Sequence, residues 1–278
     1  MMDGGEALVT RRDPADGVAS PSLLRVNLIG LLTIVRKEVS RVLRIWVQTI
    51  VPPAITMTLY FIIFGSLIGR RVGDMEGIPY TLFIAPGLIM MSVITNSFGN
   101  VVSSFFSGKL HHHLEEMLVS PLSVATIIAG YVVGGIVRGL AVAALVTLVA
   151  MFFADLRVEH PLITLSIVVL TAATFSLAGL LNAIFAKNFD EISIIPTFVL
   201  TPLTYLGGVF FSIALLSSGW QAIARVNPIL YMVNGFRYGM LGTSDIPIGA
   251  AYAIIVSAVT VLYGVVHWLL KRGTGIRA

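Results

Sequence analysis

Residues 192–241 read ISIIPTFVLTPLTYLGGVFFSIALLSSGWQAIARVNPILYMVNGFRYGML, and this stretch sets the architecture of the chain. Between Glu191 and Arg225 lie 33 residues without a charge. At about 1.5 Å per residue, one helix of that length would reach roughly 50 Å, whereas the hydrocarbon core of a membrane is about 30 Å thick. A single membrane span therefore uses only part of the stretch.

The two parts of this stretch differ in kind. The first part fits a crossing helix that is bent at Pro196 and Pro202 and ends at Gly207-Gly208. In residues 209–241, serine, glycine, asparagine and proline separate apolar pieces that are too short to cross. Short helices that lie in or dip into the membrane interface would satisfy their own backbone hydrogen bonds. We therefore expect such helices after the fifth span.

The composition indicates an integral membrane protein. Of 278 residues, 56% are hydrophobic and 12% are charged, and the mean hydropathy is +0.93. The absence of cysteine excludes disulfides, thiolate metal sites and cysteine nucleophiles. Although the net charge is +4, the basic residues lie at the edges of apolar runs, so they indicate membrane topology rather than a nucleic-acid partner.

Apolar runs divide the chain into a tail and a membrane domain. Residues 1–22 are predicted to be a flexible cytoplasmic tail, and they show no cleavable signal peptide. Residues 23–278 form the membrane domain, which is all-α and polytopic with six transmembrane helices. The predicted spans are about 47–69, 80–102, 122–153, 161–186, 190–212 and 247–270.

An amphipathic helix is predicted over residues 23–46, before the first span. Its apolar stripe at helical spacing consists of Leu28, Leu31, Leu32, Val35, Val39, Val42, Leu43 and Trp46. Lys37, Arg41 and Arg44 fall on the opposite side. We expect this helix to rest on an anionic cytoplasmic surface, either as a topology anchor or as part of the grip on a soluble partner.

Lysine and arginine counts orient the membrane domain, because cytoplasmic loops carry the excess of these residues. With six spans, both termini lie on one side. That side holds Arg11, Arg12, Arg25, Arg36, Lys37, Arg41, Arg44, Lys109, Lys187, Lys271, Arg272 and Arg277. The other side holds Arg70, Arg71, Arg157, Arg225 and Arg237, and Arg138 remains inside a span. Both termini are therefore predicted to be cytoplasmic.

The loop at residues 103–123 predicts a short helix with an acidic, solvated side. Lys109, Glu115 and Glu116 would face water, together with two histidines, and Leu118 would face an apolar surface. His112 and Glu116 are four residues apart, so a metal pair is geometrically possible, but no third ligand accompanies them. We prefer a solvated helix that another protein contacts and predict no metal site.

Arg138 and a set of glycines stand out in the third span. A charge near the middle of a span costs about 2.5–3.5 kcal/mol on insertion scales, so Arg138 should face the protein interior or a wet cavity. Its partner could be a backbone carbonyl or a substrate. Gly130, Gly134, Gly135 and Gly139 recur at four-residue spacing, which favours close helix packing.

Catalytic signatures are missing from the sequence. It contains no HExxH, no GxSxG and no GxxxxGK[ST]. We therefore predict no catalytic residue, no bound cofactor and no nucleotide-binding loop in this chain. If ATP drives its activity, another polypeptide binds it.

Four long blocks of sequence stand in a characteristic order: RIWVQTIVPPAITMTLYFIIFG at 44–65, APGLIMMSVITNSF at 85–98, FVLTPLTYLGGVFFS at 198–212 and NPILYMVNGFRYG at 227–239. With these blocks, the chain resembles the permease subunits of type-2 ABC exporters, the ABC-2 family, and most closely the YadH-like bacterial inner-membrane permeases. The resemblance covers about residues 28–275.

The resemblance implies roles for particular segments. Residues 23–46 would be the connecting helix, residues 109–121 the coupling helix that docks on the ATPase, and residues 209–241 the outward re-entrant helices. The implied ATPase-docking residues are Glu115, Glu116, Leu118, Ser120, Pro121, Lys37 and Arg41. The implied re-entrant or substrate-path residues are Asn227, Pro228, Tyr231, Arg237 and Arg138. Relatives often have proline before the tryptophan, where this chain has Ser217-Ser218-Gly219-Trp220.

The resemblance also implies a mechanism and partners. Two copies of the permease would pair through their first and fifth spans in the lipid of the bacterial inner membrane. Two ATPase subunits, which bind ATP and Mg, would dock beneath them and shift the permeases about their interface. Independently of the resemblance, the apolar lining and the absence of acidic residues within the spans favour an amphipathic or lipid-linked cargo over a bare ion. A non-transporting membrane scaffold and, less favoured, an intramembrane enzyme are the alternatives.

Overall fold

The computed structural model describes residues 22–75 and 77–274. The predicted tail, residues 1–22, therefore lies outside the described residues except for Ser22. Helices make up 82% of the described residues, which confirms the helical class predicted from the apolar runs. The first half contains α1 (Leu23–Arg44), α2 (Trp46–Tyr60), a π-helical segment (Phe61–Ile68), α3 (Gly69–Val72), β1 (Asp74–Met75), β2 (Ile78–Pro79), α4 (Tyr80–Leu110), α5 (His113–Val119) and α6 (Val124–Ala150). The second half contains α7 (Pro161–Phe185), α8 (Phe189–Ile195), a second π-helical segment (Pro196–Leu200), α9 (Thr201–Tyr205), a 3-10 turn (Ile213–Leu215), α10 (Ser218–Val226), α11 (Pro228–Leu241) and α12 (Ile248–Arg272).

Five helices of the described chain are long and apolar enough to cross a membrane. They are Trp46–Val72, Tyr80–Leu110, Val124–Ala150, Pro161–Phe185 and Ile248–Arg272, which correspond to the first four predicted spans and the sixth. The second of them, α4, continues to Leu110, beyond the predicted end at residue 102. The prediction marked the end of the apolar run, and the helix extends past that run.

The predicted fifth span, residues 190–212, is not among these five helices. A shorter helix in this part of the chain runs from Phe189 to Tyr205 through α8, the π-helical segment and α9. Gly208 has a φ of +74°, a left-handed conformation that favours glycine, and it turns the chain away. Residues 206–212 are therefore turns, which corrects the predicted C-terminal boundary. The predicted end at Gly207-Gly208 lies within three residues of the observed one.

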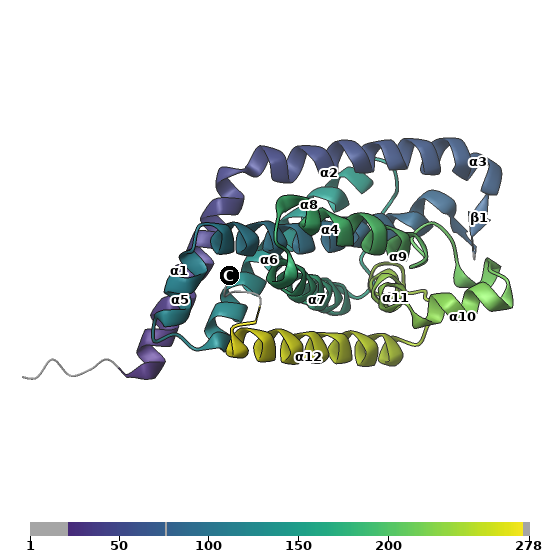
Figure 1. Ribbon diagram of the computed structural model, residues 1–278. Helices are drawn as coiled ribbons and strands as arrows, with labels where there is room; N and C mark the ends of the chain where they lie inside the picture. Colours follow the sequence, from purple (N-terminus) through teal and green to yellow (C-terminus); the bar gives the residue numbers. More distant parts are fainter. Residues whose placement is uncertain (1–21, 76, 275–278) are drawn as a thin grey trace, which may run out of the picture.

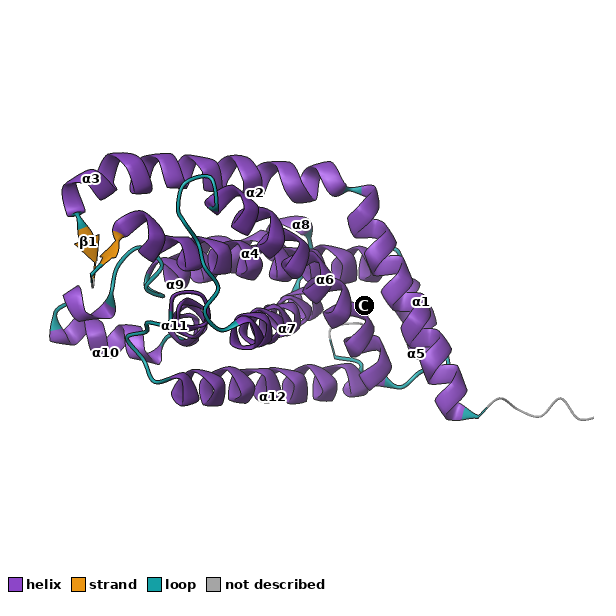
Figure 2. Cartoon of the chain, turned by 180° about the vertical axis from the view of Figure 1, so that it is seen from behind, coloured by secondary structure: helices purple, strands orange, loops and turns teal. Residues whose placement is uncertain are grey.

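The long helices form a bundle with two distinct ends. Along opposite edges lie α2 and α12, with α4, α7 and α11 between them (Figure 1). One end of the bundle carries α1, α5 and the last turn of α12, and we call it the α5 end. The opposite end carries α10 and the antiparallel pair of β1 and β2, and we call it the α10 end (Figure 2).

Glycines of α6 allow three neighbouring helices to approach closely, as their spacing predicts. A Cβ atom on Gly130 would lie 2.5 Å from Ile34 of α1, and one on Gly139 would lie 2.3 Å from Ser97 of α4. On Gly135 it would lie 2.1 Å from the Ser176 Oγ of α7. These separations leave no room for a methyl group, so the prediction of close helix packing is confirmed.

We expect the Gly135→Ala variant to be less stable than the natural chain. The added methyl group must displace Ser176, and overpacking of this kind costs about 1–3 kcal/mol. In the matched control, Gly99→Ala, the new Cβ meets nothing within 4 Å, and the change raises helix propensity by up to about 1 kcal/mol. Thermal unfolding in detergent measures both variants. Equal midpoints for the two would contradict the packing of α6.

Candidate functional site

Helix α5 presents two glutamates at the α5 end of the bundle. His112 adopts a left-handed conformation with φ 59°, which separates α5 from the end of α4. Leu114 is fully buried and anchors α5, while Glu115 and Glu116 are exposed in its first turn, where acidic groups are favourable. The coupling helix was predicted over residues 109–121, and the structure has the helix α5 over His113–Val119 within that range.

The polar side chains of the predicted loop at residues 103–123 lie in two different surroundings, one around α5 and one at the end of α4. The His112 Nδ1 lies 3.1 Å from the Glu115 Oε1, and no group of three metal-ligating side chains occurs among the described residues. Lys109 was predicted to face water, and this is wrong. It belongs to α4, and its Nζ donates to the carbonyl oxygens of Ile184 and Ala186 at 2.8 and 2.9 Å. Lys109 thereby caps the C-terminal end of α7, where a cation is favourable.

Helix α1 is fastened to the loop that follows α5. The Asn27 Oδ1 accepts hydrogen bonds from the Ser123 backbone N–H at 2.7 Å and from the Thr126 Oγ1 at 2.8 Å. Gly30 lies against Leu122, whose Cδ2 is 2.3 Å from the position of a Cβ on Gly30. Beside these contacts, the Ser120 Oγ donates to the Met117 carbonyl and Pro121 follows it. These contacts attach α1 to the loop between α5 and α6.

A buried polar cluster joins α1 to α4. Glu38 has no exposed surface, and its carboxylate accepts from the Ser104 Oγ at 2.5 Å and from the Arg41 Nη2 at 3.2 Å. The same Arg41 nitrogen donates to the carbonyl oxygen and the Oδ1 of Asn100 at 2.9 and 2.7 Å. We call these four residues the Glu38 cluster.

The Glu38 cluster corrects the predicted placement of one residue of α1, Arg41. It was placed opposite the apolar stripe with Lys37 and Arg44, but it turns into the bundle and 26% of its side chain is exposed. Lys37 and Arg44 are exposed as predicted, and the Lys37 Nζ lies 6.0 Å from the centre of the Tyr131 ring. Sequence reasoning missed Glu38. The sequence feature that could have indicated Glu38 is an acidic residue among the basic residues of α1.

Arg138 lies on the side of α6 that also carries Gly134, which packs on Glu38. It forms no hydrogen bond or ion pair with residues 22–75 or 77–274, and Arg41 is close enough to oppose its charge. The predicted backbone carbonyl partner is therefore not found within the described chain.

Near the α10 end, Asn227 and Tyr231 hold α10 and α11 together. The Asn227 Oδ1 accepts from the Ile229 N–H at 3.0 Å and so caps α11, which begins at Pro228. The Asn227 Nδ2 donates to the Leu203 carbonyl at 2.6 Å, and the Tyr231 hydroxyl donates to the Arg225 carbonyl at 2.8 Å. The helix α10 itself starts at Ser218, within the sequence Ser217-Ser218-Gly219-Trp220.

Arg237 braces the turn that ends α9. Only 1% of Arg237 is exposed, its Nη2 donates to the Gly208 carbonyl at 2.6 Å, and its guanidinium centre lies 4.0 Å from the Phe83 ring centre. The Arg237 Nη1 donates to the Asn234 Oδ1 at 3.4 Å, which also accepts from the Asp245 N–H. These contacts favour a bracing role for Arg237 over contact with a substrate.

Five apolar helices around buried polar clusters define a polytopic membrane protein. The sequence model of the ABC-2 type transporter matches residues 30–241. The chain belongs to the ABC-2 type transporter family, so the predicted resemblance is confirmed. Membership makes it a transport permease and not an enzyme, and it implies partnership with an ABC ATPase subunit.

The sequence is also similar to individual proteins from bacteria. The chain is 54% identical to the inner membrane transport permease YadH of Escherichia coli (strain K12), over 92% of this chain and 100% of the relative. It is 24% identical to nodulation protein J of Neorhizobium galegae, over 66% of this chain and 71% of the relative. Nodulation protein J of Rhizobium meliloti (strain 1021) is 21% identical, over 77% of this chain and 82% of the relative. These relationships and the apolar helices support a multi-pass protein of the inner membrane.

Proposed function

We propose that this chain is the membrane-spanning permease subunit of an ABC exporter that moves an amphipathic or lipid-linked cargo across the bacterial inner membrane. A separate ATPase subunit supplies the energy and holds ATP and Mg. The observation that carries this proposal is α5, whose acidic side is exposed while Leu114 anchors its other side in the bundle. Such a helix can receive a soluble partner and pass its movement to the membrane helices.

The proposed docking surface is centred on α5. It comprises the exposed Glu115 and Glu116, the half-buried Leu118 and Ser120, the exposed Pro121, and the exposed Lys37 of α1. Arg41 is held in the Glu38 cluster, so its contribution is to fix α1 beside α5. When the ATPase dimer closes on ATP, its push on α5 reaches α1 through Asn27 and α7 through Lys109.

Two copies of the permease pair through their first and fifth spans in this proposal. Buried residues make up only 17% of the most apolar window of Trp46–Val72, against 72% in α4, so much of the first span is left for a partner or lipid. The exposed Gln48 of α2 and the half-buried Asn96 of α4 line a groove of about 270 Å³ between these helices. Polar groups beside an apolar wall suit a second copy or an amphipathic cargo better than lipid alone.

The segment from Phe189 to Leu241 supplies the fifth span and the re-entrant helices in this proposal. The helix Phe189–Tyr205 would be about 26 Å long at about 1.5 Å per residue, close to the thickness of the hydrocarbon core. After it, α10 exposes Trp220, Ile223 and Val226, and this apolar side would lie in the outer leaflet. The five candidate spans contain no Asp or Glu, which disfavours a proton-driven pump.

Single cysteines test the proposed orientation, because the natural chain has none. We expect a membrane-impermeant maleimide to label Thr243→Cys in intact cells and to label Thr274→Cys only after the membrane is opened. Both residues are exposed in the folded chain, so a difference in labelling reports the side of the membrane on which each one lies. Labelling in the reverse order would contradict the cytoplasmic placement of the termini.

The experiment that tests the function is purification of the tagged chain from its native membranes in mild detergent. Mass spectrometry then identifies the accompanying proteins, and ATP hydrolysis is assayed in the same sample. We expect a soluble protein with a Walker A motif at about one copy per permease and vanadate-sensitive hydrolysis. Recovery of the permease alone, under conditions that preserve a known ABC complex, would favour a non-transporting scaffold.

A further inference from the structure

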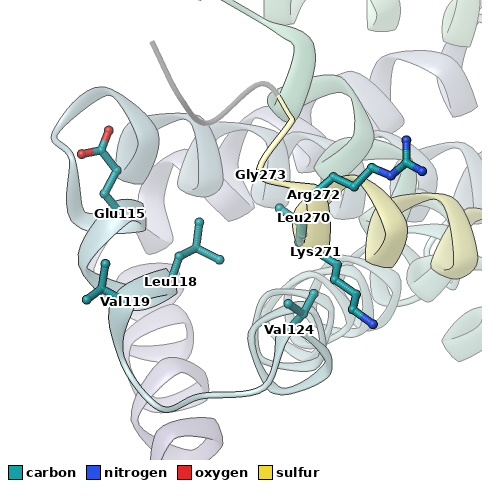
Figure 3. Close-up of a pocket in the computed structure, with 8 residues that line it drawn as sticks. All are labelled: Glu115, Leu118, Val119, Val124, Leu270, Lys271, Arg272 and Gly273. Atoms are coloured by element: carbon teal, nitrogen blue, oxygen red, sulfur yellow. The ribbon is translucent and has the colours of Figure 1, made fainter.

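A groove of about 360 Å³ lies between α5 and the C-terminal end of α12 (Figure 3). Leu118 of α5 points across the groove toward Leu270 of α12, and Val124 of α6 lies below them (Figure 3). Charges of opposite sign stand on its two sides, with Glu115 on α5 and Lys271 on α12. The groove therefore combines an apolar interior with a rim of mixed charge.

The end of α12 is held in place beside α5. Gly273 has a φ of +68°, and the Thr274 N–H donates to the Leu269 carbonyl at 3.1 Å, so the helix ends in a tight turn at the groove. The Arg272 guanidinium lies 4.1 Å from the centre of the Trp268 ring. Arg272 is stacked there and the neighbouring Lys271 is exposed, so this wall of the groove carries two cations.

We propose that the end of α12 forms the second wall of the ATPase-docking site, so that the ATPase inserts a segment with an apolar side chain and an acidic group between α5 and α12. This inference rests on the proposed function. The groove is continuous with the acidic side of α5, because Glu115 belongs to both. The acidic group of the inserted segment pairs with Lys271 and Arg272, and its apolar side chain covers Leu118 and Leu270.

The mixed charge of the rim distinguishes a protein partner from a lipid headgroup. A phosphate would be attracted by Lys271 and repelled by Glu115, whereas a protein segment can match both signs. Contact with α12 also gives the ATPase a second way to transmit movement to the helices of the bundle. Since α12 packs on α7 and α11, movement of its end reaches the re-entrant region, which α5 does not touch directly.

Cross-linking tests this inference on the complete complex of the permease with its identified Walker-motif ATPase. The single-cysteine variants Lys271→Cys, Glu116→Cys and Arg70→Cys each receive a benzophenone maleimide, and the adducts are identified by mass spectrometry after illumination. Arg70 lies at the α10 end and is the negative control. We expect ATPase adducts from the first two variants and none from the third.

The outcomes separate the inference from the proposed function. ATPase adducts from Glu116→Cys without any from Lys271→Cys would overturn the α12 wall and leave the proposed function standing. Adducts from Lys271→Cys to a second permease copy, to lipid or to the permease's own terminus would overturn it too. If neither variant gives an ATPase adduct, the proposed function fails and this inference with it.

Charge substitutions supply an independent measurement. We expect Lys271→Glu combined with Arg272→Glu to lower the ATPase recovered with the permease at least tenfold. The conservative pair Lys271→Arg and Arg272→Lys keeps both charges and should recover the natural amount of ATPase. Because these cations also bear on membrane orientation, ATPase recovery is divided by the amount of each permease variant inserted in the membrane. Equal recovery from the reversed and conservative pairs would overturn the proposed contact.

Discussion

Replacement of Glu115 and Glu116 by lysine is expected to lower the ATPase recovered with the permease at least tenfold. The Glu115 and Glu116 side chains are 51% and 81% exposed, so they contribute little to the packing of α5. Their loss at a helix N-terminus costs about 0.3–1 kcal/mol each, which leaves the membrane domain folded. The large effect comes from the change of four charge units at the docking surface, because the new lysines would face groups of the same sign on the ATPase.

A matched control places the same charge change at the other end of the bundle. Asp155 and Glu159 are exposed in the loop between α6 and α7, and their replacement by lysine should leave ATPase recovery within about twofold of the natural chain. ATPase recovery is measured by quantitative mass spectrometry, and membrane insertion by the yield of permease. Natural recovery from the Glu115 and Glu116 variant would contradict a docking role for α5.

Replacement of Glu38 by glutamine is expected to destabilise the permease by about 3 kcal/mol, at the lower end of the range for breaking a buried ion pair, because Arg41 keeps some exposure. The glutamine has nearly the same shape and can still accept from Ser104. It removes the negative charge that compensates Arg41 between α1 and α4. A lower thermal unfolding midpoint in detergent measures this effect.

A double-mutant cycle separates the charge from the packing. If Arg41 is uncompensated in Glu38→Gln, then Glu38→Gln combined with Arg41→Met should be less destabilised than the sum of the single variants. Lys37→Met, next in sequence and exposed, should change stability by less than about 0.5 kcal/mol. Strict additivity of the Glu38 and Arg41 variants would show that the buried pair does not hold α1 to α4.

The long helices and the glycine-rich contact face of α6 could be predicted because each leaves a pattern in the local sequence. An uninterrupted apolar run marks a helix such as Pro161–Phe185, and the glycine spacing of α6 marks its close contacts. The predicted span was extended to residue 212, seven residues beyond the end of α9 at Tyr205, because Phe210 and Phe211 continue the apolar run. Hydropathy alone does not detect the turn at Gly208, whereas the glycine pair Gly207-Gly208 predicted the end of the helix to within three residues.

Residues of the site were harder to predict because they depend on which helices meet. Periodicity puts Arg41 on the polar side of α1, but it cannot show that Asn100 of α4 lies there with a carbonyl and an amide to receive it. Lys109 was misplaced for the same reason, since the end of α7 is distant in sequence. The groove between α5 and α12 joins residues more than 140 positions apart, and no local pattern could indicate it.

We propose that two copies of this permease work together with a separate ATPase, and the mass of the intact complex tests this proposal. Native mass spectrometry would be applied to the tagged complex purified from its own membranes with ATP and Mg. Two permease chains of 29.9 kDa with two copies of a Walker-motif ATPase are the predicted result. A permease monomer or dimer without an ATPase, from a preparation that keeps a known ABC complex intact, would contradict the account.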